Sequence, residues 1–85
     1  MKVLKIAGTP IDLREQESAF APGATVVLWN LTAGALSILT SDASNGDFYE
    51  LVEVAASEII NVTLDNAFIM VDAYYGDDEV FLTAS

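Results

Sequence analysis

The sequence contains neither cysteine nor histidine. Without cysteine it has no disulfides, thiolate nucleophiles or sulfur metal ligands. Without histidine it lacks the usual general base at neutral pH and the commonest transition-metal ligand. Most hydrolytic chemistry is therefore disfavoured. We expect a protein that is not an enzyme, with no catalytic, cofactor-binding or metal-binding residues and no cofactor.

Basic residues are scarce, with three against 13 acidic residues, so the formal net charge is −10. Binding to phosphate backbones depends on cations that displace counterions, and only Lys2, Lys5 and Arg14 are available. The composition therefore predicts no nucleic-acid partner. Because all three basic residues lie in the first 14 positions, it also predicts a polarised molecule with a basic end for contact with an acidic surface.

Long apolar runs are also missing. No run of 18 apolar residues exists that could cross a membrane as a helix. The N-terminus, Met-Lys-Val-Leu-Lys-Ile, lacks the continuous apolar segment and the small-residue cleavage site of a signal peptide. We expect no membrane partner and no secretion by that route.

Apolar residues are nevertheless abundant, at 53% of the 85 residues, where soluble domains usually have about 45–50%. A chain of this length forms a single domain, residues 1–85, which buries only about 60% of the surface that its unfolded chain exposes. A thin core cannot hide all the apolar side chains. The surplus predicts burial against a partner or another copy, so we expect a homo-oligomer.

Short β-branched and aromatic runs separated by turn signals predict an all-β domain, a small antiparallel β-sandwich or barrel of about seven to eight strands. The expected strands cover residues 2–7, 11–13, 25–31, 36–40, 48–55, 58–64, 67–75 and 79–83. The run at 25–31 is apolar on both faces, which is typical of a strand buried on both sides. We therefore place Trp29 in the core. The other expected core residues are Val27, Leu31, Ile38, Val52, Val54, Val62, Ile69 and Val71.

The strongest turn signal is Asn45-Gly46, because asparagine and glycine readily adopt the positive φ angles of tight hairpins. Asp42, Asn45 and Asp47 around it could hold Ca²⁺, but their spacing matches a calcium loop poorly, and an ordinary hairpin turn is the preferred interpretation. Glu50 and Glu53 are expected on opposite faces of one strand, so they do not form an acid–base pair.

Two stretches near the N-terminus carry a family resemblance: Met-Lys-Val-Leu-Lys-Ile-Ala-Gly-Thr-Pro-Ile-Asp-Leu and Ala-Pro-Gly-Ala-Thr-Val-Val-Leu-Trp-Asn-Leu-Thr. With the later Asn-Gly turn, they resemble small β-rich virion proteins of marine tailed bacteriophages. The turn Ala55-Ala56-Ser57-Glu58 has Ser57 where that group has glycine, and residues 63–66 match its Thr-Asp-Thr-Leu segment only in part. The resemblance implies a capsid decoration or cement protein without enzymatic activity.

From that resemblance and the apolar surplus we expect a non-enzymatic subunit, made in the host cytoplasm, that binds the major capsid protein on the virion surface and stabilises the shell. A DNA-mimic or anti-defence inhibitor that uses its acidity, and a head-completion or tail subunit, are the alternatives. The candidate contact residues are Lys2, Lys5, Arg14, Phe20, Tyr74 and Tyr75. Of the two tyrosines, one should point away from the core because neighbours in a strand face opposite ways.

Overall fold

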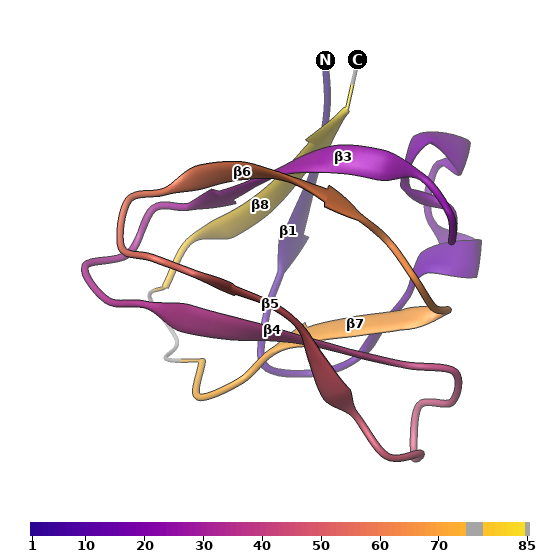
Figure 1. The fold of residues 1–85 in the computed structure, drawn as a ribbon. Helices are drawn as coiled ribbons and strands as arrows, with labels where there is room; N and C mark the ends of the chain where they lie inside the picture. Colours follow the sequence, from indigo (N-terminus) through magenta and orange to yellow (C-terminus); the bar gives the residue numbers. More distant parts are fainter. Residues whose placement is uncertain (75–77, 85) are drawn as a thin grey trace.

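The computed structural model describes residues 1–74 and 78–84. These residues form eight strands and two 3-10 turns (Figure 1). The strands are β1 (Lys2–Ile6), β2 (Ile11–Asp12), β3 (Thr25–Asn30), β4 (Leu36–Ser41), β5 (Tyr49–Val54), β6 (Ile59–Thr63), β7 (Phe68–Val71) and β8 (Val80–Ala84). The 3-10 turns are η1 (Leu13–Glu15) and η2 (Ser18–Phe20). All eight expected strands are present, with ends that differ by a few residues.

The strands form two four-stranded antiparallel sheets, ordered β1-β8-β3-β6 and β2-β7-β4-β5, which pack face to face (Figure 1). The expected all-β sandwich is therefore confirmed. The first strand pairs with the last, the second with the seventh, the third with the sixth and the fourth with the fifth. The chain is thus one long hairpin with its tip between β4 and β5, rolled up by further pairing of β3 with β8 and β4 with β7. This is the strand order of an eight-stranded jelly roll.

The core lies between the two sheets and takes alternate residues from each strand, as the period of two in a strand requires. Expected core residues confirmed as buried are Ile38, Val54, Val62, Ile69 and Val71, and Val52 is partly buried against them. Core residues not expected from the sequence include Ile6, Leu13, Phe20, Leu28, Leu64, Val80 and Leu82.

The expected orientation of β3 is wrong by one residue. Val26, Leu28 and Asn30 face the core, whereas Val27 and Trp29 lie on the outer face and Leu31 is exposed. A buried asparagine is costly unless its hydrogen bonds are made, and here they are. The Asn30 side-chain amide donates to the backbone oxygens of Gly34 and Ala55 at 2.9 and 3.0 Å, and more distantly to Val54 at 3.3 Å.

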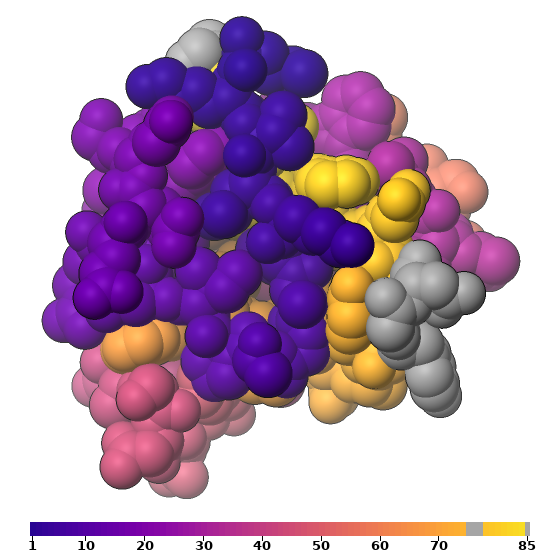
Figure 2. Space-filling view, turned by 180° about the vertical axis from the view of Figure 1, so that it is seen from behind, coloured from indigo at the N-terminus to yellow at the C-terminus, as the bar shows by residue number. Residues whose placement is uncertain are grey.

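The hairpin expected at Asn45-Gly46 is present, but its geometry differs from the expected tight turn. Seven residues, 42–48, separate β4 from β5, and the loop closes through a hydrogen bond of 3.1 Å from Gly46 N to Ala43 O. The described residues with positive φ are Gly23, Ser57 and Ala73, so the Asn-Gly pair does not supply that conformation. Space-filling shows this loop protruding at one corner of the molecule (Figure 2).

An irregularity in β5 changes where its acidic side chains point. Opposite β4, Val52 pairs with Ile38 but Glu50 pairs with Leu39, so a β-bulge lies at Leu51. The bulge breaks the expected alternation. Glu50 therefore shares a face with Glu53, whose partner is Ser37, so the expectation that these two carboxylates lie on opposite faces is wrong. The Glu50 carboxylate accepts a 2.8 Å hydrogen bond from the Ser37 hydroxyl.

Candidate docking face

The outer face of the sheet β1-β8-β3-β6 carries a continuous group of apolar side chains. Strand register places Phe81 beside Trp29 and Trp29 beside Ile59, in one row across three strands. Val3 and Val27 flank Thr83 in the next row. We call this surface the apolar face, formed by Val3, Val27, Trp29, Leu31, Ile59 and Phe81. Val3, Leu31 and Ile59 are 54%, 48% and 54% exposed, so large apolar side chains are exposed on this one face from β1 to β6.

Charge is almost absent from this sheet. None of its four strands contains aspartate or glutamate, although the chain has 13 acidic residues. Lys2 and Lys5 are its only charged side chains, both in the edge strand β1, and Lys5 lies beside Phe81. Glu58 and Glu79 lie just outside strands β6 and β8, at the border of the sheet. In a molecule of net charge −10, this face alone is not acidic among the described strands.

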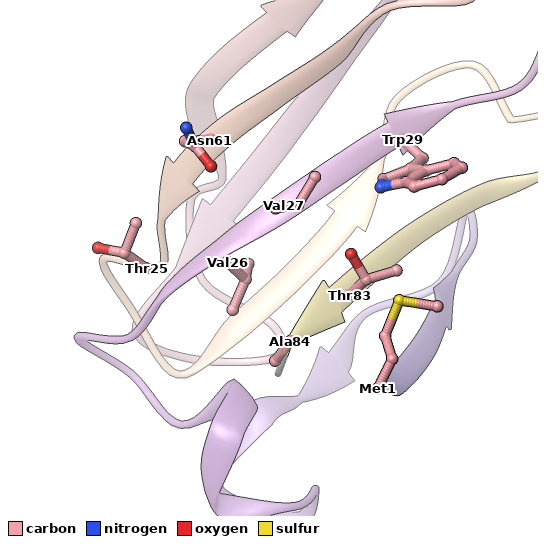
Figure 3. Close-up of a pocket in the computed structure, with 8 residues that line it drawn as sticks. All are labelled: Met1, Thr25, Val26, Val27, Trp29, Asn61, Thr83 and Ala84. Carbon is pink, nitrogen blue, oxygen red and sulfur yellow. The ribbon is translucent and has the colours of Figure 1, made fainter.

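Trp29 lies near the middle of the apolar face, beside a surface hollow of about 850 Å³. Figure 3 shows its indole ring above Thr83 and Met1, with the ring nitrogen on the side of Val27. That nitrogen is buried and has no hydrogen-bond partner among the described residues. An unmet buried donor is costly. The face therefore combines apolar area with one hydrogen-bond donor whose acceptor is not supplied by the surrounding chain.

One end of the face is more polar but still neutral. Asn61 and Thr83 lie in the same row as Val27, and the hydroxyls of Thr25 and Thr63 are hydrogen-bonded to each other at 2.9 Å. Neutral amide and hydroxyl groups can be covered by a partner at lower cost than carboxylates. The whole surface is thus suited to docking against an uncharged surface, with Lys5 at its edge able to meet an acidic group.

The expected basic end does not form as one patch, because two of its three cations are paired. The Lys2 ammonium lies 3.4 Å from a Glu17 carboxylate oxygen. The Arg14 guanidinium makes two hydrogen bonds of 2.9 Å to Asp12 and lies over the Phe68 ring on the other sheet. Lys5 is exposed on the edge of the apolar face, so it is the basic residue best placed for contact.

The pairing of Asp12 with Arg14 also changes their titration. Side-chain hydrogen bonds from Arg14 are the main cause that lowers the pKa of Asp12 below its ordinary value, with desolvation opposing them. The same hydrogen bonds raise the pKa of Arg14. Both groups are committed to each other at neutral pH, and Asp12 also accepts the Arg14 backbone N–H that begins η1.

Of the aromatic contact candidates, Phe20 does not lie where it was expected. It is 2% exposed and packs in the core through η2, so it cannot meet a partner in this conformation. Tyr74 is half-buried, and its hydroxyl donates to the Asp78 backbone oxygen at 2.8 Å. Tyr75 lies outside the described residues, so the expectation about which tyrosine points outward is not resolved.

The remaining chemistry-bearing groups do not converge. Within residues 1–74 and 78–84, no three His, Cys, Asp or Glu side chains gather as they would around a metal ion. Across the same residues, no helix is long and apolar enough to span a membrane. The apolar face is the feature of the described surface that calls for a functional explanation.

Comparisons with known proteins give no further information on identity. No protein family model matches the chain, and neither the curated proteins nor the solved structures include a significant match.

Sequence reasoning missed most of this face, since Val3, Ile59 and Phe81 were not singled out and Trp29 was placed in the core. One signal was present in the sequence. The segments that become β1, β3, β6 and β8 are free of acidic residues in a strongly acidic chain, and Ile59 interrupts an otherwise polar alternate set in β6.

Proposed function

We propose that this protein is a non-enzymatic virion structural protein, a capsid decoration or cement subunit that binds the major capsid protein of a phage shell. The single observation that carries the proposal is the apolar face, an acid-free sheet surface on a molecule of net charge −10. Such a surface has little use on a free monomer and marks an interaction site.

Docking through the apolar face would orient the molecule on the shell. Trp29, Phe81 and their neighbours would be removed from water, and Lys5 would meet acidic groups of the shell. The acidic second sheet and the loops would then face outward, where like charge keeps particles apart. A modest contact is useful at every position of the shell, because about 1.4 kcal/mol of binding free energy raises the binding constant there tenfold.

The fold is compatible with this role but does not decide it. Jelly rolls occur in viral capsid domains and in lectins, and a fold alone does not determine function. The sequence segments that resemble virion proteins of marine tailed phages add support, because they include the whole of β1 and β3.

The test is to find the protein in purified particles of the phage that encodes it, by mass spectrometry for copy number and cryo-electron microscopy for position. Hundreds of copies on the shell, with the β1-β8-β3-β6 sheet against it, are expected. About a dozen copies would indicate a head-completion ring instead. Absence from particles, together with tight binding to a host nuclease or polymerase, would replace this proposal with the acidic inhibitor.

A matched pair of variants tests the face itself. Leu31→Glu places a carboxylate on the apolar face, and Tyr49→Glu places one at an equally exposed position, 51% exposed, on the edge strand of the other sheet. Particles stripped of the protein should rebind Tyr49→Glu like the natural chain and rebind Leu31→Glu poorly. Equal rebinding would contradict docking through this face.

A further inference from the structure

We propose that in the free protein the apolar face is covered by the apolar face of a second copy, in a two-fold symmetric dimer. This inference concerns the protein before it meets any shell, so it goes beyond the decoration role and does not depend on it. The dimer would have to open for docking, because both contacts use the same surface.

The positions of the charged residues indicate which surface two copies of this chain can bring together. Two molecules of net charge −10 repel each other, and most approaches bring carboxylates face to face. The outer face of β1-β8-β3-β6 is the exception, since its strands contain no acidic residue. Face-to-face contact there removes apolar side chains from water without opposing like charges.

The strand order makes the face self-complementary. A two-fold axis parallel to the strands, between β8 and β3, places β8 of one copy over β3 of the other, and β1 over β6. Phe81 and Trp29 share a row, so each Phe81 then lies over Trp29 of the second copy, and this aromatic contact occurs twice.

The same operation places a basic side chain at each border of the contact. Lys5 belongs to the row of Phe81, Trp29 and Ile59, so it lies over Ile59 of the second copy. The methylene groups of a lysine can cover an apolar side chain while its ammonium group stays in water.

The area of the face sets the strength of the contact. Four strands about 4.8 Å apart and five residues long, at about 3.3 Å per residue, give a projected area of roughly 300 Å². Stable complexes bury about 800 Å² per partner. The dimer should therefore be weak, with a dissociation constant above about 1 µM, which leaves the face free to exchange onto a larger surface.

Sedimentation velocity of the full chain at neutral pH, from about 10 µM to 1 mM, tests the proposal. In about 0.15 M salt the mass should rise with concentration from 9.1 kDa toward twice that value. At about 0.01 M salt the association should weaken, because the longer Debye length leaves the like charges unscreened. A monomer at 1 mM in both salts would overturn the proposal.

Variants separate this contact from other modes of association. Val3→Glu and Leu31→Glu change exposed positions that the fold should tolerate, as circular dichroism can verify, and each should shift the dissociation constant at least tenfold upward. Tyr49→Glu adds the same charge at similar exposure elsewhere and should shift it less than threefold. A dimer that survives both face variants, as pairing of sheet edges would, overturns the proposal.

A substitution at the border tests the direction of packing. Lys5→Glu places a carboxylate over Ile59 of the second copy and should weaken the dimer. An unchanged dissociation constant, with the fold intact, overturns the arrangement. None of these results depends on finding the protein in virions, so this proposal and the decoration role can fail separately.

Discussion

Leu28 and Trp29 are neighbours in β3 whose surroundings are opposite, since Leu28 is fully buried and Trp29 lies on the outer face. Replacing Leu28 with alanine leaves a core cavity and should cost about 2–5 kcal/mol of unfolding free energy. Trp29→Ala should cost less than about 2 kcal/mol, because it removes a partly exposed ring and its unpaired N–H. Urea unfolding followed by circular dichroism measures both losses of unfolding free energy. A loss above about 2 kcal/mol for Trp29→Ala would show that the ring belongs to the core.

Asn30 joins the loop that follows β3 to the distant end of β5. Its amide donates to Gly34 and Ala55, and its side-chain oxygen accepts from the backbone N–H and the hydroxyl of Thr32, at 2.9 and 2.6 Å. Asn30→Ala leaves the part-buried carbonyl groups of Gly34 and Ala55 and the buried one of Val54 without this donor, and should cost about 1–3 kcal/mol.

Asn30→Asp should behave differently with pH, because a buried carboxylate would face carbonyl oxygens and its pKa would rise. The variant's deficit should then grow as the pH rises above about 4. The deficit of Asn30→Ala should stay nearly constant over the same range. Chemical denaturation at pH 4.5 and pH 7 distinguishes the two, and a pH-independent Asn30→Asp deficit would contradict burial of this side chain.

At the scale of elements, the positions of the strands along the sequence were predictable. Which face of each strand is buried was less predictable. Strand β6 was oriented correctly because Val62 and Leu64 alternate with polar neighbours. Strand β3 was oriented wrongly because both of its faces are apolar, so no alternation in the sequence marks the buried face. The Asn30 amide is satisfied on the inner side by Gly34 and by the distant carbonyls of Val54 and Ala55, and no local pattern shows the last two. The bulge at Leu51 likewise results from pairing with β4 and leaves no local sign.

The junction between β2 and η1 carries a prediction at this scale. Arg14 lowers the pKa of Asp12, so the stabilisation from this pair is present above the ordinary pKa of aspartate and is lost as the pH falls through the folded value. Arg14→Gln should raise the pKa of Asp12 toward its ordinary value. Carboxyl titration by NMR measures this, with Lys5→Gln as the control that should leave Asp12 unchanged.

At the scale of the whole molecule, the rolled hairpin sorts the charge. Each connection except the one between β4 and β5 passes from one sheet to the other, so segments spread along the sequence are gathered by sheet. Strands β1, β3, β6 and β8, none of which contains an acidic residue, thereby become one surface, whereas the acid-free strands β4 and β7 share their sheet with the acidic β2 and β5. Segments far apart in the sequence thus become one neutral apolar side of the molecule.

This segregation predicts how association responds to acid. As the pH falls from 7 toward the sequence pI of about 4.1, carboxylates gain protons and the net charge of −10 shrinks toward zero. The repulsion that opposes contact then weakens, while the apolar faces are unchanged, so association should increase steadily below about pH 5.5. Light scattering during a pH titration measures the mean mass. A variant with both Val3→Glu and Leu31→Glu should stay monomeric to a lower pH than the natural chain, and Tyr49→Glu should not. If all three proteins associate at the same pH, general loss of charge drives the association and the apolar face does not direct it.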